Sequence, residues 1–454
     1  MLHAAGFLLL LLQSKWYPFL TMVRILPFPA LRYNPARVRL ADVVTQPYDK
    51  ITAEMQERYY AASPHNLVRI ILGKREPSDN GQNVYSRAAT AFSQWRKDGI
   101  FIQDPDPMLY AYAQEFALPG SPENRLERRG FIGLGQLEPY DAGVVFRHEQ
   151  THSGPKADRL NLLRATRAHF GQLFMLYNDP AGEIDDALAK VARHPADVEL
   201  RDEYEVLHRL WPVPGLVEFI RRRMENTKLI IADGHHRYET ALNYQRERRE
   251  QDAAAPPPGE AAYDRVMMTF INMYAEGLVI LPTHRVIAGL ESFREEQFLE
   301  SARVLFNVEP VQVSGAAQAI AILQSAGNQG TALLAVMQGG SFLLRARPAE
   351  VDQTLAQLSP HQRGLDVVIL HKLGLELVLG ISEEAIREQR YISYLRDAGE
   401  AIARVHNGAN VAFLMNPVRI DQVRDTAFAG EVLPQKSTDF YPKLLSGLTI
   451  YALE

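Results

Sequence analysis

Residues 228–250 read KLIIADGHHRYETALNYQRERRE, and this stretch decides how the middle of the chain folds. Residues 229–232 are a short apolar run with β-branched side chains, which is typical of a buried strand. Residues 238–250 have helical composition and end in basic side chains, as the last turns of helices often do. The stretch therefore predicts a strand that turns through Asp233 and Gly234 into a helix.

The turn between that strand and that helix has the chemistry of an anion site. The first turn of a helix leaves backbone N–H groups unpaired, and the helix dipole adds to their attraction for an anion. Gly234 allows a positive φ or a close backbone approach, and Asp233 can cap the helix or hold a metal ion. His235, His236 and Arg237 add donors, of which the planar Arg fork suits phosphate oxygens. Residues 233–237 are therefore predicted to bind phosphate, with an ordinary helix entry as the alternative.

Outside this stretch the pattern alternates between β-rich runs and amphipathic stretches of helical length, which predicts a mixed α/β (α+β) fold. Helices are expected at residues 53–61, 85–97, 157–169, 217–224, 238–250, 291–304, 315–326 and 349–356. Strands are expected at residues 67–72, 109–116, 131–137, 144–147, 173–177, 229–232, 266–273, 331–337 and 341–345.

At 454 residues the chain exceeds what one hydrophobic core usually serves, so two domains are expected. A new alternation of helices and strands begins after Arg285, which predicts an N-terminal domain over 22–285 and a C-terminal α+β domain over 286–454. Residues 1–21 are predicted to be a non-native extension, with Met22 as the natural start. Their apolar run has no Lys or Arg before it and is far short of the ~20 residues that span a bilayer. An export signal is the alternative.

Composition excludes several classes of site. The chain has no cysteine, so disulfides, thiolate nucleophiles and cysteine metal sites are ruled out, as is usual for a cytoplasmic protein. Its formal net charge of -5 gives no global attraction to DNA or to an acidic membrane surface, so neither partner is expected. Catalysis, if present, must run on oxygen and nitrogen groups.

The residues 148–152 match the zinc-protease pattern H-E-x-x-H, in which both histidines lie on one face of a helix. An expected strand ends just before His148, and Gly154 and a proline follow almost at once, so little room is left for such a helix. We therefore expect Glu149 to act as a general base or a metal-binding carboxylate, with His148 beside it and Asp49 as the rival base. A metal-dependent hydrolase using His148, Glu149 and His152 remains an alternative.

Two further groups of cations are candidate phosphate ligands. Lys156 and Arg159 stand in the first turn of the helix expected after Pro155, where an anion is favoured. Lys436 with Ser437 offers a cation and a hydroxyl, although no Gly-x-x-x-x-Gly precedes the lysine as it would in a Walker A loop.

Residues 232–242, ADGHHRYETAL, resemble the phosphate-binding motif of the ParB and sulfiredoxin-like superfamily, whose free serine kinases carry a similar turn. The chain as a whole, from about Met22 to its C-terminus, resembles the microbial family catalogued as domain of unknown function (DUF) 1015. The resembling segments are PFPALRYNP (27–35), QPYD (46–49), SPHN (63–66), HEQT (148–151), GPKADRL (154–160) and PQKSTDFYPKL (434–444). The resemblance implies a ParB/sulfiredoxin-like core elaborated into a larger N-terminal lobe, with an α+β lobe after it.

The function that this resemblance implies is nucleotide-dependent phosphoryl transfer to a small hydroxyl amino acid, as in free serine kinases, or the reverse reaction, phosphoserine dephosphorylation. The expected ligands are a nucleoside di- or triphosphate and Mg²⁺, with Asp233 and Glu149 as metal-binding residues. Serine or phosphoserine is the expected small-molecule substrate. A ParB-like regulatory switch that binds a nucleoside triphosphate is the alternative from another class.

Overall fold

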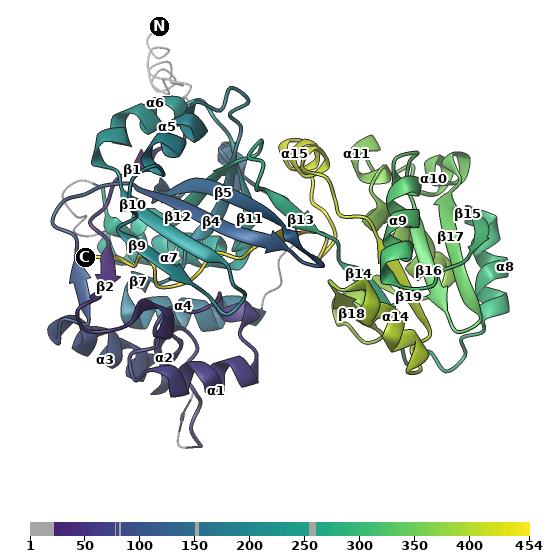
Figure 1. The fold of residues 1–454 in the computed structure, drawn as a ribbon, viewed down its shortest axis with the longest axis horizontal. Coiled ribbons are helices and arrows are strands. Elements are labelled where there is room, and N and C mark those ends of the chain that lie inside the picture. The colour runs from purple at the N-terminus through teal and green to yellow at the C-terminus, as the bar shows by residue number, and fades with distance from the viewer. Residues whose placement is uncertain (1–21, 78, 81–82, 150–153, 254–259) are drawn as a thin grey trace, which may run out of the picture.

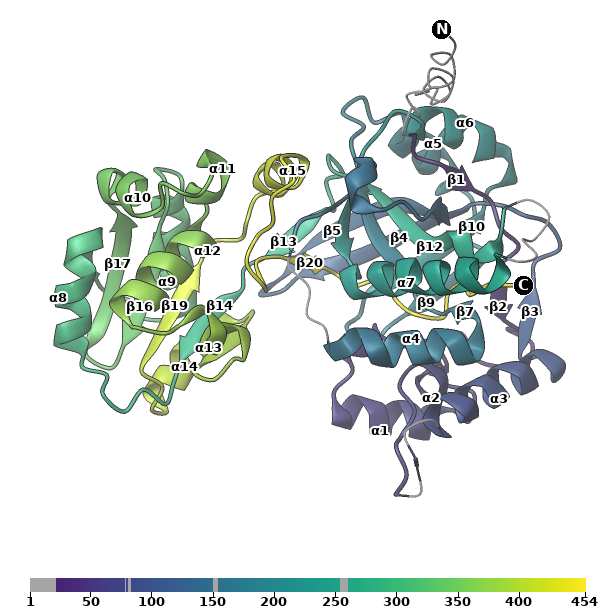
Figure 2. The same cartoon turned by 180° about the vertical axis from the view of Figure 1, so that it is seen from behind.

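The structure is a computed structural model that describes residues 22–77, 79–80, 83–149, 154–253 and 260–454. The predicted extension over 1–21 and His152 of the zinc hypothesis lie outside these residues. The described chain forms a larger lobe around a mixed sheet and a smaller lobe around an antiparallel sheet, side by side (Figures 1 and 2). The expected mixed α/β class is confirmed.

In the large sheet, the C-terminal end of the short strand β6 lies beside residues 233–237, the DGHHR turn. Its strands follow the order β6-β11-β8-β12-β5-β4-β10-β9, and β1 pairs with β5. Strand β11 runs parallel to β6, with Ile231 opposite Arg147. Because parallel neighbours end at the same edge of a sheet, the residues after β6 emerge beside the residues after β11. The strands are β1 (Ile25–Leu26), β4 (Tyr110–Leu118), β5 (Ser121–Gln136), β6 (Val145–Arg147), β8 (Leu173–Tyr177), β9 (Val198–Arg201), β10 (Leu207–Pro212), β11 (Leu229–Asp233) and β12 (Arg265–Asn272).

The two faces of the large sheet are covered by different parts of the chain. Leu229 and Ile231 of β11 face a core shared with helices α5 (Glu183–Val191), α6 (Val217–Met224) and α7 (His235–Asp252). Ile230, on the opposite face, belongs to a core that includes Phe440 and Leu444 from the end of the chain. Side chains alternate across a strand, so β11 is sealed on both sides and its C-terminal end is held rigidly.

A layer of helices and short strands lies beside α7, and the sequence analysis assigned one of its elements wrongly. Residues 67–72 were expected to form a strand, but Val68–Ile71 form helix α2, and the Asn66 side chain accepts a hydrogen bond from the Val68 N–H at 2.9 Å. A short apolar run does not distinguish a buried helix from a strand by periodicity. The other elements of this layer are β2 (Leu31–Tyr33), α1 (Ala53–Ala62), α3 (Asn83–Lys97), β3 (Phe101–Gln103), α4 (Gly154–Thr166) and β7 (Ala168–His169).

The smaller lobe contains a sheet in the order β15-β17-β16-β19-β14-β18, in which all neighbouring pairs are antiparallel. Its strands are β14 (His284–Ile287), β15 (Phe306–Val311), β16 (Leu333–Met337), β17 (Gly340–Ala346), β18 (Ile392–Leu395) and β19 (Val411–Met415). Its helices are α8 (Glu295–Leu305), α9 (Ala316–Gly327), α10 (Pro348–Thr354), α11 (Pro360–Arg363), α12 (Asp366–Ile369), the π-helix η6 (Leu370–Val378), α13 (Glu383–Arg387), α14 (Ala398–His406) and α15 (Ile420–Phe428).

The chain crosses between the lobes twice. It leaves the larger lobe through β13 (Val279–Leu281) into β14, and it returns through β20 (Asp439–Tyr441), which pairs with β13, and β21 (Tyr451–Ala452), which pairs with β7. The sequence analysis placed every residue after 285 in the C-terminal unit, whereas this returning end packs on the large sheet (Figure 1). Its apolar residues complete the core of the first lobe. None of the described helices is both long and apolar enough to cross a membrane.

The close packing of β5 against β12 leads to a stability prediction at Gly130. A Cβ atom at this position would overlap the carbonyl oxygen of Phe270 and the side chain of Ile271. We expect Gly130→Ala to lower the free energy of unfolding by about 1 to 3 kcal/mol, the usual cost of overpacking, measured by urea denaturation. Gly215→Ala is the control, because nothing lies within 4 Å of its added Cβ. Equal stability of the two variants would contradict the described packing.

Candidate functional site

A cleft of about 680 Å³ lies between the lobes, at the sheet edge where β6 and β11 end. The larger lobe contributes the DGHHR turn and Glu149, the smaller lobe contributes residues around β18, and the returning end contributes the residues after Pro434. The lining residues with polar or charged side chains are Tyr48, Asp49, Lys50, Glu149, Asp233, His235, His236, Arg237, Thr283, Gln389, Ser393, Tyr394, Arg396, Gln435, Lys436, Thr438, Asp439 and Lys443.

The DGHHR turn opens into this cleft. Gly234 has φ 97° and precedes helix α7, whose first turn no side chain caps. A Cβ on Gly234 would meet the Leu173 side chain at 2.9 Å and the Arg237 guanidinium at 3.0 Å, so both its φ angle and its surroundings require glycine. The turn therefore presents the positive end of an 18-residue helix to the cleft.

A chain of opposite charges crosses the cleft floor from Asp233. Its carboxylate accepts from Lys443 Nζ at 3.2 Å and from Arg237 Nη2 at 2.8 Å. Lys443 also pairs with Asp439 at 3.2 Å, and Asp439 in turn accepts from Arg396 of the smaller lobe. Burial alone would raise the pKa of Asp233, but the charges of Lys443, Arg237 and Lys50 hold it well below its ordinary value. Asp233 is therefore an anion that organises cations from three parts of the chain.

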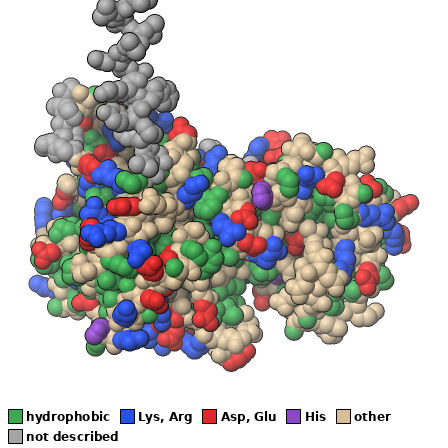
Figure 3. All heavy atoms as spheres, turned by 90° about the horizontal axis from the view of Figure 1, so that it is seen from above, with side chains coloured by type: hydrophobic (Ala, Val, Ile, Leu, Met, Phe, Trp, Pro, Cys, Tyr) green, Lys and Arg blue, Asp and Glu red, His purple; other side chains and the backbone are tan. Residues whose placement is uncertain are grey.

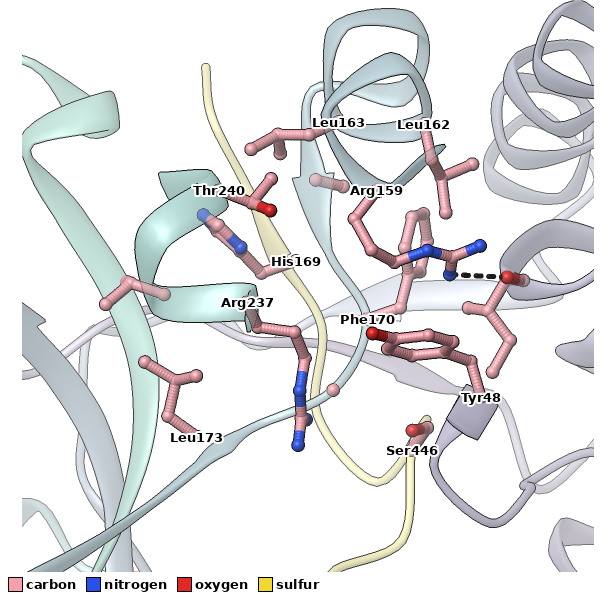
Figure 4. Close-up of a pocket in the computed structure, with 14 residues that line it drawn as sticks. Tyr48, Arg159, Leu162, Leu163, His169, Phe170, Leu173, Arg237, Thr240 and Ser446 are labelled. Carbon is pink, nitrogen blue, oxygen red and sulfur yellow. Dashed lines mark hydrogen bonds between the residues drawn. The ribbon is translucent and has the colours of Figure 1, made fainter. Parts of the chain in front are cut away.

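Arg237 supports the turn from behind. Besides Asp233, its guanidinium donates to the backbone carbonyl of Gln172 at 2.5 Å. It also borders a cavity of about 70 Å³ behind the turn (Figure 4). In that view Arg159 lies against Tyr48, with its guanidinium carbon 4.1 Å from the ring centroid, and its hydrogen bond to the Ile71 carbonyl is 2.7 Å long. A cavity of this size has room for water rather than for a nucleobase. Arg159 packs against the ring of Tyr48, the residue before Asp49, and so helps to position it.

Glu149 stands on the opposite side of the turn, at the end of β6. Its Oε1 accepts a hydrogen bond from the Lys436 backbone N–H at 2.6 Å. Burial raises the pKa of Glu149 to about 7, against the opposing effect of that N–H and of the Lys436 and Lys443 charges. Lys436 has φ 56°, unusual for a residue with a side chain, and the buried Arg285 donates to its carbonyl oxygen at 3.0 Å. The loop that meets Glu149 is thus held by the smaller lobe.

His148 does not line the cleft but lies beneath it, completely buried. Its Nδ1 bonds the Ile231 carbonyl at 2.7 Å, so Nδ1 carries the proton and Nε2 accepts from the Thr438 hydroxyl at 2.7 Å. Burial lowers the pKa of His148 to about 4, which keeps the ring neutral. Both ring nitrogens of His148 are engaged in hydrogen bonds, so neither offers a free lone pair to a zinc ion. This argues against the metal-dependent hydrolase, which required His148 as a zinc ligand. No group of three or more metal-ligating side chains is found in the described ranges.

His235, which follows the turn, lines the cleft and lies 4.9 Å from the His148 ring, centroid to centroid. Burial and the neighbouring His148 lower its pKa well below the ordinary value. Its Nε2 has no hydrogen-bond partner in the described structure.

The structure brings together only part of the set expected from sequence. Asp49, Glu149, the residues 233–237 and Lys436 all line the cleft. Lys156 pairs instead with Glu239, and Ser437 is buried and donates to the Pro434 carbonyl. With Arg159 and His148, these are the candidates that lie outside the cleft lining.

The sequence analysis missed four charged residues of the cleft, namely Lys50, Arg396, Asp439 and Lys443. Asp439 and Lys443 lie within PQKSTDFYPKL, and Lys50 directly follows QPYD, so one of the segments singled out for the family resemblance contained two of these residues and another adjoined a third. Arg396 has no such motif around it.

Two polar residues of the large sheet fix the position of Lys443. The buried Arg128 donates to the carbonyls of Tyr441 at 3.0 Å and Pro442 at 2.5 Å, and its guanidinium lies over the Phe174 ring. Gln114 donates to the Lys443 carbonyl at 2.9 Å. The backbone on both sides of the Lys443 Cα is therefore tied to β4 and β5, and the Lys443 ammonium group lies against Asp233.

A family model described as "Protein of unknown function (DUF1015)" matches residues 25–368, most of the chain. The chain belongs to this family. A search of curated proteins finds no match. Among solved structures, this DUF1015 chain is similar to a free serine kinase variant in complex with ADP, with TM-score 0.35 and 12% identity over 68% of this chain and 88% of the other. It is also similar to SbnI from Staphylococcus aureus, with TM-score 0.33 and 11% identity over 70% and 87%. A conserved hypothetical protein from Pyrococcus furiosus gives TM-score 0.33 and 13% identity over 67% and 90%.

The surface of the DUF1015 chain shows no extended basic face on the side drawn in Figure 3, where Lys and Arg are interspersed with Asp and Glu across both lobes. Nucleic-acid-binding surfaces usually gather their basic side chains on one face. The cations of the cleft are a local feature.

The central place of Asp233 in this DUF1015 chain leads to the second prediction. Asp233→Asn leaves Lys443, whose side chain is 9% exposed, with Asp439 as its remaining carboxylate, so the unfolding free energy should fall by about 3 kcal/mol. Urea denaturation measures the change, and adding Lys443→Met to Asp233→Asn should recover part of it. Asp49→Asn is the matched control, because Asp49 is exposed and should shift stability by less than about 0.5 kcal/mol. Equal effects of Asp233→Asn and Asp49→Asn would contradict the network.

Proposed function

We propose that this DUF1015 protein is a nucleotide-dependent phosphotransferase that acts on the hydroxyl group of a small amino acid, in either direction. The observation that carries the proposal is the position of Glu149, a carboxylate with a pKa of about 7, in a cleft that also contains several cations and an uncapped helix N-terminus. A base and an anion-binding surface at one cleft are the parts that hydroxyl phosphorylation requires.

The phosphates of the nucleotide would rest on the DGHHR turn. The N-terminus of α7 favours negative charge there, and Lys50 and Lys436 line the same cleft. Lys443 is already paired with Asp233 and Asp439, whereas no ion pair within 4.0 Å between described residues involves Lys50. Burial and the nearby Lys443 lower the pKa of Lys50, against the opposing effect of Asp439, Asp49 and Asp233, and a phosphate beside it would further favour the charged ammonium group.

In the forward direction, the hydroxyl oxygen of the amino acid attacks the terminal phosphorus, its bond to phosphorus forms, and the bond to the leaving phosphate oxygen breaks. Glu149 accepts the hydroxyl proton. A base with a pKa near 7 is deprotonated in about half of the molecules at neutral pH and still retains the basicity to take that proton. In the reverse direction the protonated Glu149 returns the proton to the serine oxygen.

Magnesium would enter with the nucleotide, where it neutralises charge on the phosphates during transfer. Mg²⁺ in such sites uses one or two protein carboxylates in addition to phosphate oxygens. Both oxygens of Asp233 already accept from cations, so Asp233 fits this role poorly. Asp49, exposed in the cleft, and Glu149 are the carboxylates that remain for it.

The rival function is a nucleotide-dependent regulator, in which nucleotide binding changes the relation of the lobes without turnover. The observation that favours it is that the cleft is built from both lobes. Phosphorus NMR of the purified protein with ATP or ADP, Mg²⁺ and free serine distinguishes the two functions, since only the enzyme makes phosphoserine. Nucleotide binding without product would establish the regulator instead.

The third prediction concerns Glu149. Glu149→Gln keeps the acceptor for the Lys436 N–H but removes the base, so turnover should fall by about 10²- to 10⁴-fold while calorimetric nucleotide affinity stays unchanged. In the wild type, kcat/KM for serine phosphorylation should rise with pH through about 7, as Glu149 loses its proton. Full activity of the variant would exclude Glu149 as the base.

A stability measurement separates this role of Glu149 from a structural one. The folded pKa of about 7 exceeds the ordinary 4.5, so the stabilising contribution of Glu149 is present below pH 4.5 and is lost as the pH rises through 7. At pH 8 the variant should therefore be at least as stable as the wild type. A less stable variant at pH 8 would indicate that charged Glu149 serves the fold.

The fourth prediction concerns Lys50. Lys50→Gln should weaken nucleotide binding by about 1.5 to 3 kcal/mol, the range for hydrogen bonds to charged groups, without lowering the melting temperature. Isothermal titration calorimetry with ADP measures the affinity. Lys97→Gln on α3 is the matched control, because Lys97 lies outside the cleft lining. If both variants bind ADP like the wild type, the phosphates do not lie beside Lys50.

A further inference from the structure

A second cavity, of about 370 Å³, lies in the smaller lobe and is separate from the catalytic cleft except for a shared wall residue, Gln435. It is bordered by the π-helix η6, by α13 and by residues 432–435 of the segment that returns to the larger lobe. A cavity of this size lies in the usual range for small-molecule sites. A π-helix of this kind is rare, and such geometry is frequently found at functional sites.

Charges of both signs line this cavity beside apolar side chains. Lys372 pairs with Glu376 at 2.8 Å and with Glu383 at 3.3 Å, so two carboxylates share one ammonium group. Arg387 is exposed at the rim, and no ion pair within 4.0 Å between described residues involves it. Leu358 and Ile386 contribute apolar surface. One excess anion and one excess cation over an apolar floor suit a ligand that carries both charges and a hydrocarbon part.

A buried, unpaired nitrogen in the cavity lining is the second sign of a ligand. His371 is 6% exposed, and its Nε2 has no hydrogen-bond partner in the described structure. Burial lowers the pKa of His371 to about 3, so the ring is neutral and Nε2 can donate or accept one hydrogen bond. Unpaired polar atoms in protein interiors are uncommon and costly, and a bound ligand would remove the cost.

We propose that this cavity binds a free α-amino acid with an apolar side chain, with its ammonium group at Glu376 and Glu383 and its carboxylate at Arg387. The proposal does not depend on the function of the cleft. It assigns a separate binding site to the smaller lobe.

The cavity wall connects this site to Glu149. Gln362 of α11 donates to the Val432 carbonyl at 3.3 Å, and the next residue, Leu433, donates to the His148 carbonyl at 2.7 Å. Three residues further on, the Lys436 N–H meets Glu149. A ligand that contacts Val432 and Gln435 therefore orders the segment that places Lys436 against Glu149, so the amino acid acts as an effector of the cleft.

The fifth prediction is tested by isothermal titration calorimetry of the full chain with L-valine, and with isobutylamine and isovalerate as its singly charged counterparts. L-valine should bind at least about tenfold more tightly than either counterpart, because each lacks one charged contact. Arg387→Gln and Glu376→Gln should each weaken L-valine binding by about 10- to 100-fold. Arg390→Gln, three residues from Arg387 and outside the cavity lining, should bind like the wild type.

The same titration in Arg396→Gln, a cleft variant, locates the ligand. Unchanged L-valine affinity in this variant supports the second cavity, whereas loss of binding there would place the amino acid in the cleft and overturn the proposal. Absence of L-valine binding, or equal binding in Arg387→Gln and the wild type, would also overturn it. ADP affinity, measured in the same proteins, reports on the cleft independently.

Hydrogen exchange tests the connection between the two sites. Saturating L-valine should slow amide exchange in peptides that cover residues 430–437 and leave β12 in the large sheet unchanged. Unchanged exchange over 430–437 would overturn the effector role.

Discussion

The partly buried ion pair between Asp233 and Lys443 joins parts of the chain that are 210 residues apart, and the architecture of the cleft depends on it. Asp233 ends the strand that precedes the DGHHR turn, and Lys443 belongs to the end of the chain after it has returned from the smaller lobe. An ion pair removed from water is stable only with good geometry and further hydrogen bonds. Arg237, Asp439 and the backbone contacts of Arg128 supply them. The turn, the returning segment and the large sheet therefore form one electrostatic unit.

A second constraint is the parallel pairing of β6 with β11. It brings Glu149 to the same sheet edge as Asp233, although the two residues belong to separate motifs. Glu149 and Asp233 then experience opposite environments. Lysine and arginine side chains surround Asp233 and keep it ionised, whereas burial dominates at Glu149 and raises its pKa. The environments of the two carboxylates therefore push their pKa values in opposite directions.

The smaller lobe contributes to the cleft mainly through side chains that hydrogen-bond the backbone of the returning segment. Arg285 binds the Lys436 carbonyl, Gln362 binds the Val432 carbonyl, and Arg396 reaches Asp439. The returning segment is thus held at both lobes by hydrogen bonds to its main chain. The returning segment connects the smaller lobe to Glu149 through the Lys436 N–H, which gives the second cavity a short physical path to the cleft.

The sequence by itself determined the strand, the turn and the helix around Asp233 and Gly234, because apolar periodicity and turn chemistry are local properties. It also predicted roles for Glu149 and Lys436, and both line the cleft. It did not distinguish helix α2 from a strand, since four apolar-rich residues fit either one, and it did not show that His148 and Arg237 are occupied by backbone carbonyls. Those outcomes, and the roles of Lys50, Arg396, Asp439 and Lys443, were decided by tertiary structure. Whether a charged side chain faces a ligand or another charge depends on which distant segments pack beside it, and no local pattern carries that information.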